Sequence, residues 1–177
     1  MVTCCYNSAN HVSTIYINGR RCGILEGVIN LTDPKAVFIG GDIYVKGYQG
    51  LVSDLRIFDQ PLSFEVVQRM YQKIRIRMQE GTEEAEEHKP EVHSVRFPLN
   101  QTLMEENGTA ECIFHGKEAV YGEGPVKGTY ALRLAGGMIG ENVLELPDKF
   151  ADLESFTVSY WIKDENPREW VSSFYMK

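Results

Sequence analysis

The acidic, histidine and glycine-rich segments of this sequence contain no recognisable catalytic motif. A retaining glycosidase needs two carboxyl groups about 5–5.5 Å apart. A strand supplies them when acidic residues alternate on one face, but Glu145 is followed by Leu146-Pro147-Asp148, which leaves the strand. Gly122-Glu123-Gly124 lacks the Lys-Ser/Thr pair of a phosphate-binding loop. The four histidines are scattered, with no serine or cysteine nucleophile motif beside them: His11, His88, His93 and His115. We therefore expect a protein that is not an enzyme and has no catalytic residue.

Aromatic and basic side chains are the better candidates for binding a ligand. An aromatic ring at the rim of a fold can stack on the face of a sugar, and Tyr48 and Trp170 are the candidates for that role. The alternative for both rings is packing in the core or at a sheet edge. A basic cluster comprises Arg69, Lys73, Arg75 and Arg77. It could bind a heparin-like ligand, or it could be a solvent-exposed face beside the acidic run that follows it.

The cysteines and the glycosylation sequons are the residues from which the cellular location of the protein can be inferred. The four cysteines (Cys4, Cys5, Cys22 and Cys112) form no CxxC pair and no Cys/His cluster at zinc spacing, so we expect free thiols or one disulfide and no structural zinc. Asn30, Asn100 and Asn107 each begin an Asn-x-Thr sequon and are candidate glycosylation sites. These sequons favour a secreted parent protein and an extracellular or cell-surface location, although residues 1–5 lack the charged start and apolar core of a secretory signal.

Charge and composition limit the partners. The 177 residues carry a net charge of −7, which argues against binding nucleic acid through its phosphates. No apolar run approaches the roughly 20 residues that a membrane-spanning helix needs. We expect neither a nucleic-acid partner nor a membrane span.

The first part of the chain predicts short strands and one helix. Residues 12–23 have the alternation and the Asn18-Gly19 turn of a β-hairpin, and 37–39 form a short apolar strand. In the strand at 51–58 we expect Leu51, Leu55 and Ile57 to face the core, with Ser53 as a small exception and with Asp54 and Arg56 on the other face. The stripe of Phe64, Val67 and Tyr71 predicts one short helix near 63–73. The alternation over 74–78 fits a continued helix or a new strand.

An acidic segment divides the chain in two. Residues 80–91 carry six glutamates and no large apolar side chain, so we interpret residues 80–92 as a linker. Strand patterns resume beyond it around residues 95–99, 130–134, 143–147, 155–162 and 170–175. In 155–162 we expect Phe156, Val158, Tyr160 and Ile162 to share one face. Many short strands with regularly spaced turns predict an all-β sandwich.

Several segments resemble the laminin-G-like and pentraxin-like branch of the concanavalin A-like jelly-roll lectins. In the second half of the chain the resemblance rests on Gly128–Leu134 and on Ser155–Lys163, and in the first half it rests on Tyr16–Gly19, Ile39–Asp42, Gly50–Phe58 and Leu62–Glu65. The family's late half (residues 1–79) here precedes its early half (residues 93–177), with the linker between them. The chain is then the end of one repeat joined to the start of the next, a circularly permuted sandwich, or half of a swapped homodimer. We predict that the two halves pack together, because half a sandwich would leave a sheet face and its edges without partners.

The resemblance also implies a function. Domains of this family are non-catalytic recognition or adhesion modules that bind a glycan or a protein, often with calcium. Asp42 matches the position where pentraxin-like members place part of their calcium site, although Gly40-Gly41 replaces their carboxamide-rich run. The alternatives are a structural spacer that packs against neighbouring repeats, and a jelly roll of the glycoside-hydrolase type.

Overall fold

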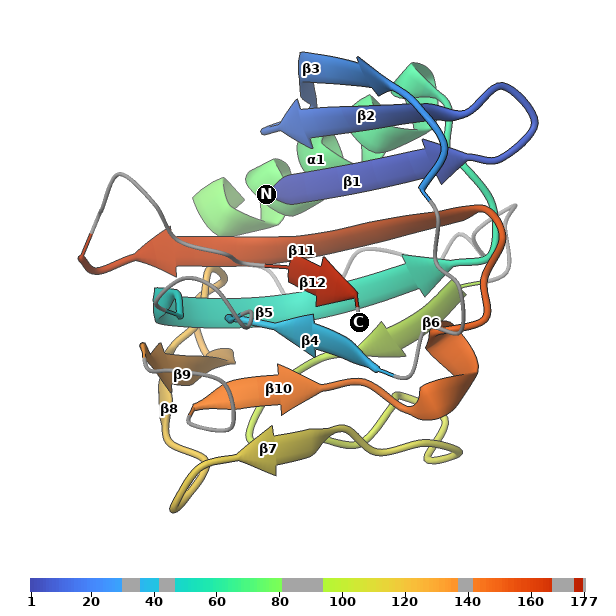
Figure 1. Ribbon diagram of the computed structural model, residues 1–177. Coiled ribbons are helices and arrows are strands. Elements are labelled where there is room, and N and C mark those ends of the chain that lie inside the picture. Colours follow the sequence, from blue (N-terminus) through green and yellow to red (C-terminus); the bar gives the residue numbers. More distant parts are fainter. Residues whose placement is uncertain (30–35, 42–46, 81–93, 137–141, 167–173, 177) are drawn as a thin grey trace.

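The structure is a computed structural model that describes residues 1–29, 36–41, 47–80, 94–136, 142–166 and 174–176. Within these residues the chain forms two antiparallel β-sheets, one α-helix and one short 3-10 helix (Figure 1). The structure therefore agrees with the predicted all-β sandwich at the level of a mostly-β fold with two sheets. None of the described helices is long and apolar enough to cross a membrane.

The two sheets differ in size. The large sheet has eight strands: β1 (Val2–Asn7), β2 (Val12–Ile17), β3 (Arg20–Glu26), β5 (Gln49–Phe58), β6 (Ser94–Phe97), β8 (Tyr121–Glu123), β9 (Tyr130–Ala135) and β11 (Phe156–Asp164). The small sheet has four: β4 (Val37–Ile39), β7 (Ile113–His115), β10 (Val143–Glu145) and β12 (Phe174–Met176). The helices are α1 (Phe64–Glu80) and the 3-10 turn η1 (Asp148–Phe150).

Each sheet contains strands from both parts of the chain. The order in the large sheet is β3-β2-β1-β11-β5-β9-β8, and β6 pairs with β5 beside β9. The central pair, β5 and β11, joins residues from either side of the acidic segment, with Val158 opposite Ile57. The prediction that the two halves pack together is thus confirmed within a single chain. Residues 81–93, which contain most of the predicted linker, lie outside the described residues.

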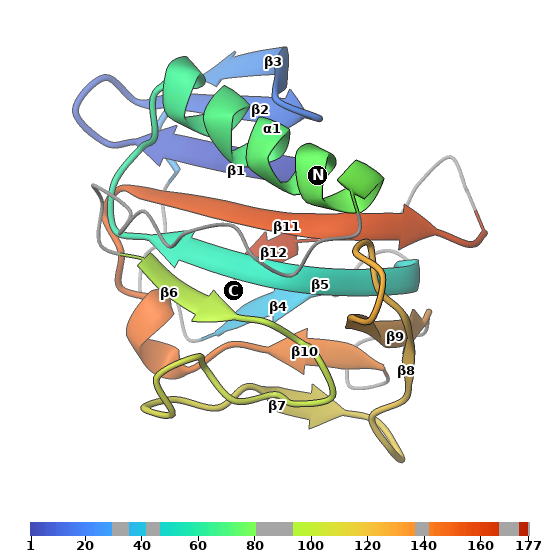
Figure 2. The ribbon, with the colours of Figure 1, turned by 180° about the vertical axis from the view of Figure 1, so that it is seen from behind.

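One face of the large sheet contacts the small sheet and the other contacts α1 (Figures 1 and 2). The space between the sheets holds the main core, in which Leu55, Phe97, Leu132 and Tyr160 are wholly buried. As predicted, Phe156, Val158 and Tyr160 lie in this core and Ile162 packs against it. A second cluster lies under α1 and comprises Met1, Cys5, Tyr16, Phe58, Leu62, Val67 and Trp161.

A β-bulge changes which residues of β5 face the core. The pairing of β5 with β11 shifts between Ser159 and Trp161, and Asp54 has a positive φ of 51°. Because the bulge reverses the alternation, Val52 joins Leu55 and Ile57 in the main core. The expectation that Leu51 shares that face is therefore wrong, and Leu51 is buried outside this cluster.

The predicted hairpin at 12–23 is confirmed as β2 and β3. Asn18 and Gly19 both have positive φ values, 51° and 71°, as a tight two-residue turn requires. A Cβ atom at Gly19 would lie 3.1 Å from the Cβ atom of Tyr71, so this turn packs directly on α1.

The helix is longer than predicted. It runs to Glu80, whereas the sequence predicted a short helix near 63–73 and left residues 74–78 undecided. The helix continues beyond residue 73 because Ile74 extends the apolar stripe of Val67, Met70 and Tyr71 that packs on the large sheet. Ile76 and Met78, which suggested a strand, are 48% and 44% exposed.

Candidate ligand-binding surface

Tyr48 lies inside the protein rather than at an exposed rim. Its side chain is 2% exposed and belongs to the main core. Its hydroxyl has no hydrogen-bond partner among the described residues, and burial raises the pKa of the phenol. Tyr48 thus offers no ring face to a sugar. The other proposed ligand-binding residue, Trp170, and the proposed calcium ligand Asp42 lie outside the described residues.

The two described sequons are at the surface. Asn100 is exposed and its side-chain oxygen accepts a hydrogen bond from the Tyr130 amide at 2.8 Å. Asn107 is exposed in a turn and donates its side-chain amide to Glu105 at 2.8 Å, while the Thr109 hydroxyl donates to the same carboxylate at 2.9 Å. Burial alone would raise the pKa of Glu105, but these hydrogen bonds hold it below its usual value. The third sequon, at Asn30, is not described.

Cysteines and acidic residues form no metal site in the part of the chain that is described. Cys4, Cys5, Cys22 and Cys112 are all unpaired, and Cys22 is exposed. Burial raises the pKa of Cys4 to about 11 and that of Cys112 to about 12, so both thiols are protonated at neutral pH. No group of three or more His, Cys, Asp or Glu side chains is placed to hold an ion among these residues.

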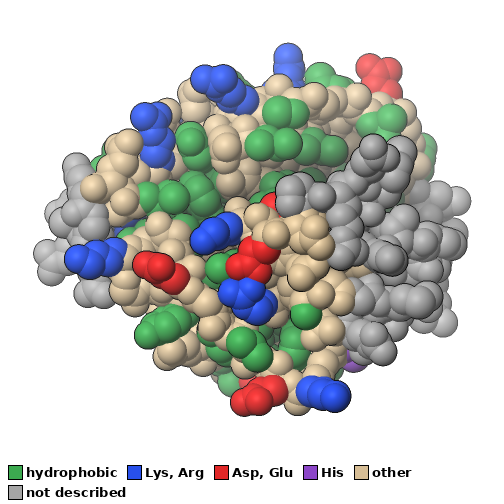
Figure 3. Space-filling model, turned by 90° about the vertical axis from the view of Figure 1, so that its left-hand side faces the viewer, with side chains coloured by type: hydrophobic (Ala, Val, Ile, Leu, Met, Phe, Trp, Pro, Cys, Tyr) green, Lys and Arg blue, Asp and Glu red, His purple; other side chains and the backbone are tan. Residues whose placement is uncertain are grey.

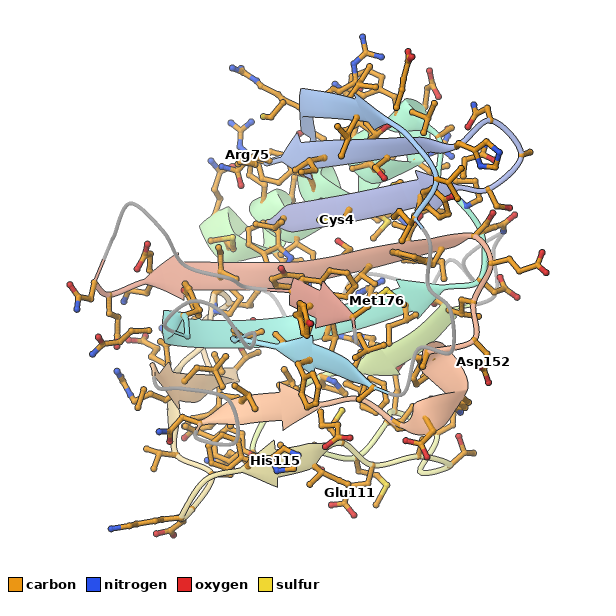
Figure 4. The ribbon with its side chains drawn as sticks, viewed as in Figure 1. Cys4, Arg75, Glu111, His115, Asp152 and Met176 are labelled. Atoms are coloured by element: carbon orange, nitrogen blue, oxygen red, sulfur yellow. The ribbon has the colours of Figure 1, made fainter. Side chains whose placement is uncertain are left out.

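The predicted basic cluster lies on α1. Arg69, Lys73 and Arg75 are exposed, and Arg77 is half-buried. Figure 4 labels Arg75 near the left end of β2, and Figure 3 shows basic and hydrophobic side chains side by side over the upper part of the molecule. Glu65 lies one turn before Arg69 and its pKa is lowered mainly by a hydrogen bond from Ser63.

The outer face of the small sheet carries a row of side chains that the sequence did not single out. Each strand places one residue in the row: Tyr175 pairs with Phe38, Phe38 with Glu145, and Glu145 with Ile113. Their neighbours in sequence, such as Ile39 and Leu144, are buried in the main core. The row therefore points away from the core by simple alternation. We call Tyr175, Phe38, Glu145 and Ile113, together with His115, the outer row.

Polar and aromatic groups meet in the outer row. The imidazole Nε2 of His115 is within hydrogen-bonding distance of the Glu145 carboxylate. The rings of Phe38 and His115 have centroids 6.3 Å apart and are tilted by 58°. The side chains of His115 and Glu145 are 34% and 20% exposed, and Ile113 is 59% exposed. Figure 4 shows His115 on β7, on the side of the small sheet opposite the large sheet.

The outer row could not be predicted from the sequence because the strands that form it are short. Residues 37–39, 113–115, 143–145 and 174–176 give three residues each, which is too little alternation to distinguish the two faces of a strand. The one available signal was Phe38, which stands between two aliphatic residues in a strand that the sequence did predict.

A small apolar gap lies between the sheets among the described residues. Its lining consists of Val37, Ile57, Leu146, Phe150, Leu153, Phe156, Val158, Phe174 and Met176. With no titratable side chain in this lining, the gap has no means of acid–base chemistry and is part of the core.

The fold and this surface define a two-sheet β protein with an aromatic and polar sheet face. Comparison with protein-family models, curated proteins and solved structures found no match for this chain.

Proposed function

We propose that this protein is a non-catalytic recognition module that binds a glycan on the outer face of its small sheet. The outer row is the observation that carries the proposal, because it combines aromatic rings, a carboxylate and an imidazole on one partly exposed sheet face. We further propose that the two-sheet fold is a laminin-G-like, concanavalin A-like jelly roll, as the sequence motifs imply.

The groups of the outer row match the surface of a sugar. A pyranose presents apolar C–H faces, which pack on rings such as those of Phe38 and Tyr175, and hydroxyl groups around its edge. The Glu145 carboxylate accepts hydrogen bonds from hydroxyls, and the His115 imidazole can donate or accept them. Few polar groups placed among apolar ones are typical of small-molecule sites.

The acidic residues that are most enclosed in the fold support a non-catalytic role. Asp54 is held by Arg56 and Arg96, and Glu105 is held by Asn107 and Thr109. Neither carboxylate is left unpaired as a nucleophile or general acid.

The sequons at Asn100 and Asn107 support an extracellular or cell-surface location, and calcium is proposed at Asp42 through the family resemblance alone.

A glycan-array screen with and without calcium, followed by titration calorimetry of the bound glycans, tests the proposal. Phe38→Ala should weaken binding at least about tenfold, because it removes the central ring of the outer row. Tyr130→Ala is the matched control: Tyr130 is a 42% exposed aromatic residue on β9 of the large sheet, and its loss should leave affinity unchanged.

Three results would decide against the proposal. Binding that Phe38→Ala leaves intact would place the ligand elsewhere. Binding that both variants weaken equally, while circular dichroism shows both folded, would mean that the outer row is not the specific site. No binding to any glycan, with or without calcium, would favour the structural spacer.

A further inference from the structure

Among the described residues, no strand pairs with the outer edge of β3. β3 is the terminal strand of the large sheet (Figure 1), and six of its seven residues are exposed. No described element lies beyond it in Figure 1 or Figure 2. A Cβ atom built on Gly23, at the middle of the strand, would meet nothing within 4 Å. An open edge strand presents backbone N–H and C=O groups that can pair with another strand.

Apolar side chains project from this edge strand. Ile24 and Leu25 are 54% and 72% exposed, which for Leu25 is the largest exposure among the large hydrophobic residues described. Ile15 and Ile17 of the neighbouring β2 are 45% and 47% exposed. Natural edge strands commonly carry proline or central lysines that block pairing. The stretch Gly23-Ile24-Leu25 carries neither.

The charges of β3 are separated along the strand. It begins with Arg20 and Arg21 and ends with Glu26, all exposed. When a strand pairs antiparallel with a copy of itself, the start of each strand lies beside the end of the other. Both arginines of one copy would then lie next to Glu26 of the second copy, and this contact would occur twice. The edge is therefore complementary in charge to itself in the antiparallel direction, whereas a parallel arrangement would set like charges side by side.

We propose that two copies of this chain associate through antiparallel pairing of β3, centred near Gly23 and Ile24. The resulting two-fold dimer joins the two large sheets into one continuous sheet. One strand pair buries less area than the roughly 1,200–2,000 Å² of a standard stable interface, so the dimer forms reversibly with protein concentration. This inference does not depend on glycan binding.

Charge reversal gives a test specific to this geometry. Glu26→Arg makes the whole edge basic, and Arg20→Glu with Arg21→Glu makes it acidic. We expect each variant alone to dimerise about tenfold more weakly than the wild type. An equimolar mixture of the two variants should form a heterodimer at least as tightly as the wild-type homodimer, because opposite charges then face each other at every position. Analytical ultracentrifugation up to about 0.5 mM, where a small reversible interface is detected, measures all three.

Two further variants make the result decisive. The triple variant Arg20→Glu, Arg21→Glu, Glu26→Arg reverses both ends in one chain and should recover the wild-type homodimer. Glu118→Arg changes an exposed charge in the turn after β7 and should have no effect. A wild type that stays monomeric, a dimer insensitive to the β3 charges, or a variant mixture that fails to associate while circular dichroism shows both variants folded would each overturn the proposal.

Discussion

β5 and β3 belong to the same sheet but occupy opposite positions in it. β5 is bordered by β11 on one side and by β9 and β6 on the other. It contributes Leu55 to the main core and Phe58 to the cluster under α1. Within the part of the chain that the structure describes, β3 pairs on one side only, with β2, and most of its side chains are exposed. The comparison shows where this molecule gains its stability and where its surface is open to a partner.

The size difference between the two sheets produces this contrast. The four strands of the small sheet do not extend over β1–β3 (Figure 1). Ile15 and Ile17 alternate with Tyr16, which packs under α1, so they lie on the opposite face and stay exposed. Residues of β5 have neighbours on both faces, so a substitution there must alter packed contacts. Residues of β3 meet mostly solvent, so their side chains are available for recognition without a cost in stability.

The largest expected difference between the strands comes from a pair of leucines. Leu55 on β5 is fully buried and Leu25 on β3 is 72% exposed. Leu55→Ala should lower the free energy of unfolding by about 3 kcal/mol, because it removes buried methyl groups and leaves a cavity. Leu25→Ala should change it by less than about 0.5 kcal/mol. Urea unfolding followed by circular dichroism measures both, and equal losses would contradict the contrast.

A pair of glycines should give the next largest difference. A Cβ atom at Gly50 would overlap the Lys163 carbonyl oxygen and the Tyr48 hydroxyl, whereas one at Gly23 would meet no atom within 4 Å. Gly50→Ala should therefore cost about 2 kcal/mol of stability through forced displacement of β11 or Tyr48. Gly23→Ala should be neutral or slightly stabilising, since alanine restricts the unfolded chain. Thermal unfolding of both variants tests this, and a stable Gly50→Ala protein would show that the β5–β11 contact is looser than described.

The smallest expected difference in stability is between substitutions of two carboxylates, the ion-paired one of Asp54 on β5 and the exposed one of Glu26 on β3. Burial by itself would raise the pKa of Asp54, but the guanidinium groups of Arg56 and Arg96, the latter at 2.6 Å, hold it below its ordinary value. Because the folded pKa is lower than the unfolded one, this contribution to stability is complete above about pH 4 and is lost as the pH falls through the folded pKa.

Asp54→Asn should accordingly cost about 1.5 kcal/mol at pH 7 and less near pH 2, because the wild-type carboxylate is progressively protonated as the pH falls toward its folded pKa. Glu26→Gln on β3 should change stability by less than about 0.5 kcal/mol at either pH. Urea unfolding at the two pH values provides the measurement. A loss for Asp54→Asn that is the same at both would mean that the charge of Asp54 is not what stabilises the fold.

Much of the fold could be predicted because its signals are local. The Asn18-Gly19 dipeptide specifies the turn of the hairpin, and the alternation of Phe156, Val158 and Tyr160 specifies both the strand and its buried face. The motifs around Gly50–Phe58 and Ser155–Lys163 also led us to expect that the two halves share a core. Local geometry and hydrophobic period are properties of neighbouring residues, so they can be recognised without the fold.

The candidate site could not be predicted in the same way. Phe38, His115 and Glu145 come from three short strands and are neighbours only because β4, β10 and β7 pair in one register. Tyr48 was a candidate for stacking on a sugar, with packing in the core or at a sheet edge as the alternative, and its sequence neighbourhood did not distinguish the two. Its burial follows from the packing of the loop before β5 into the main core.

The sequence by itself determined the mostly-β character, the hairpin and the buried face of β11, since these depend on backbone preferences and on the period of side chains along a strand. Only the tertiary structure decided three other features. The bulge at Asp54 replaced Leu51 with Val52 in the main core, contact with the large sheet extended α1 to Glu80, and the strand order put β3 at the end of the large sheet. Each of these depends on contacts between residues far apart in the chain, whose free energies outweigh the local preferences.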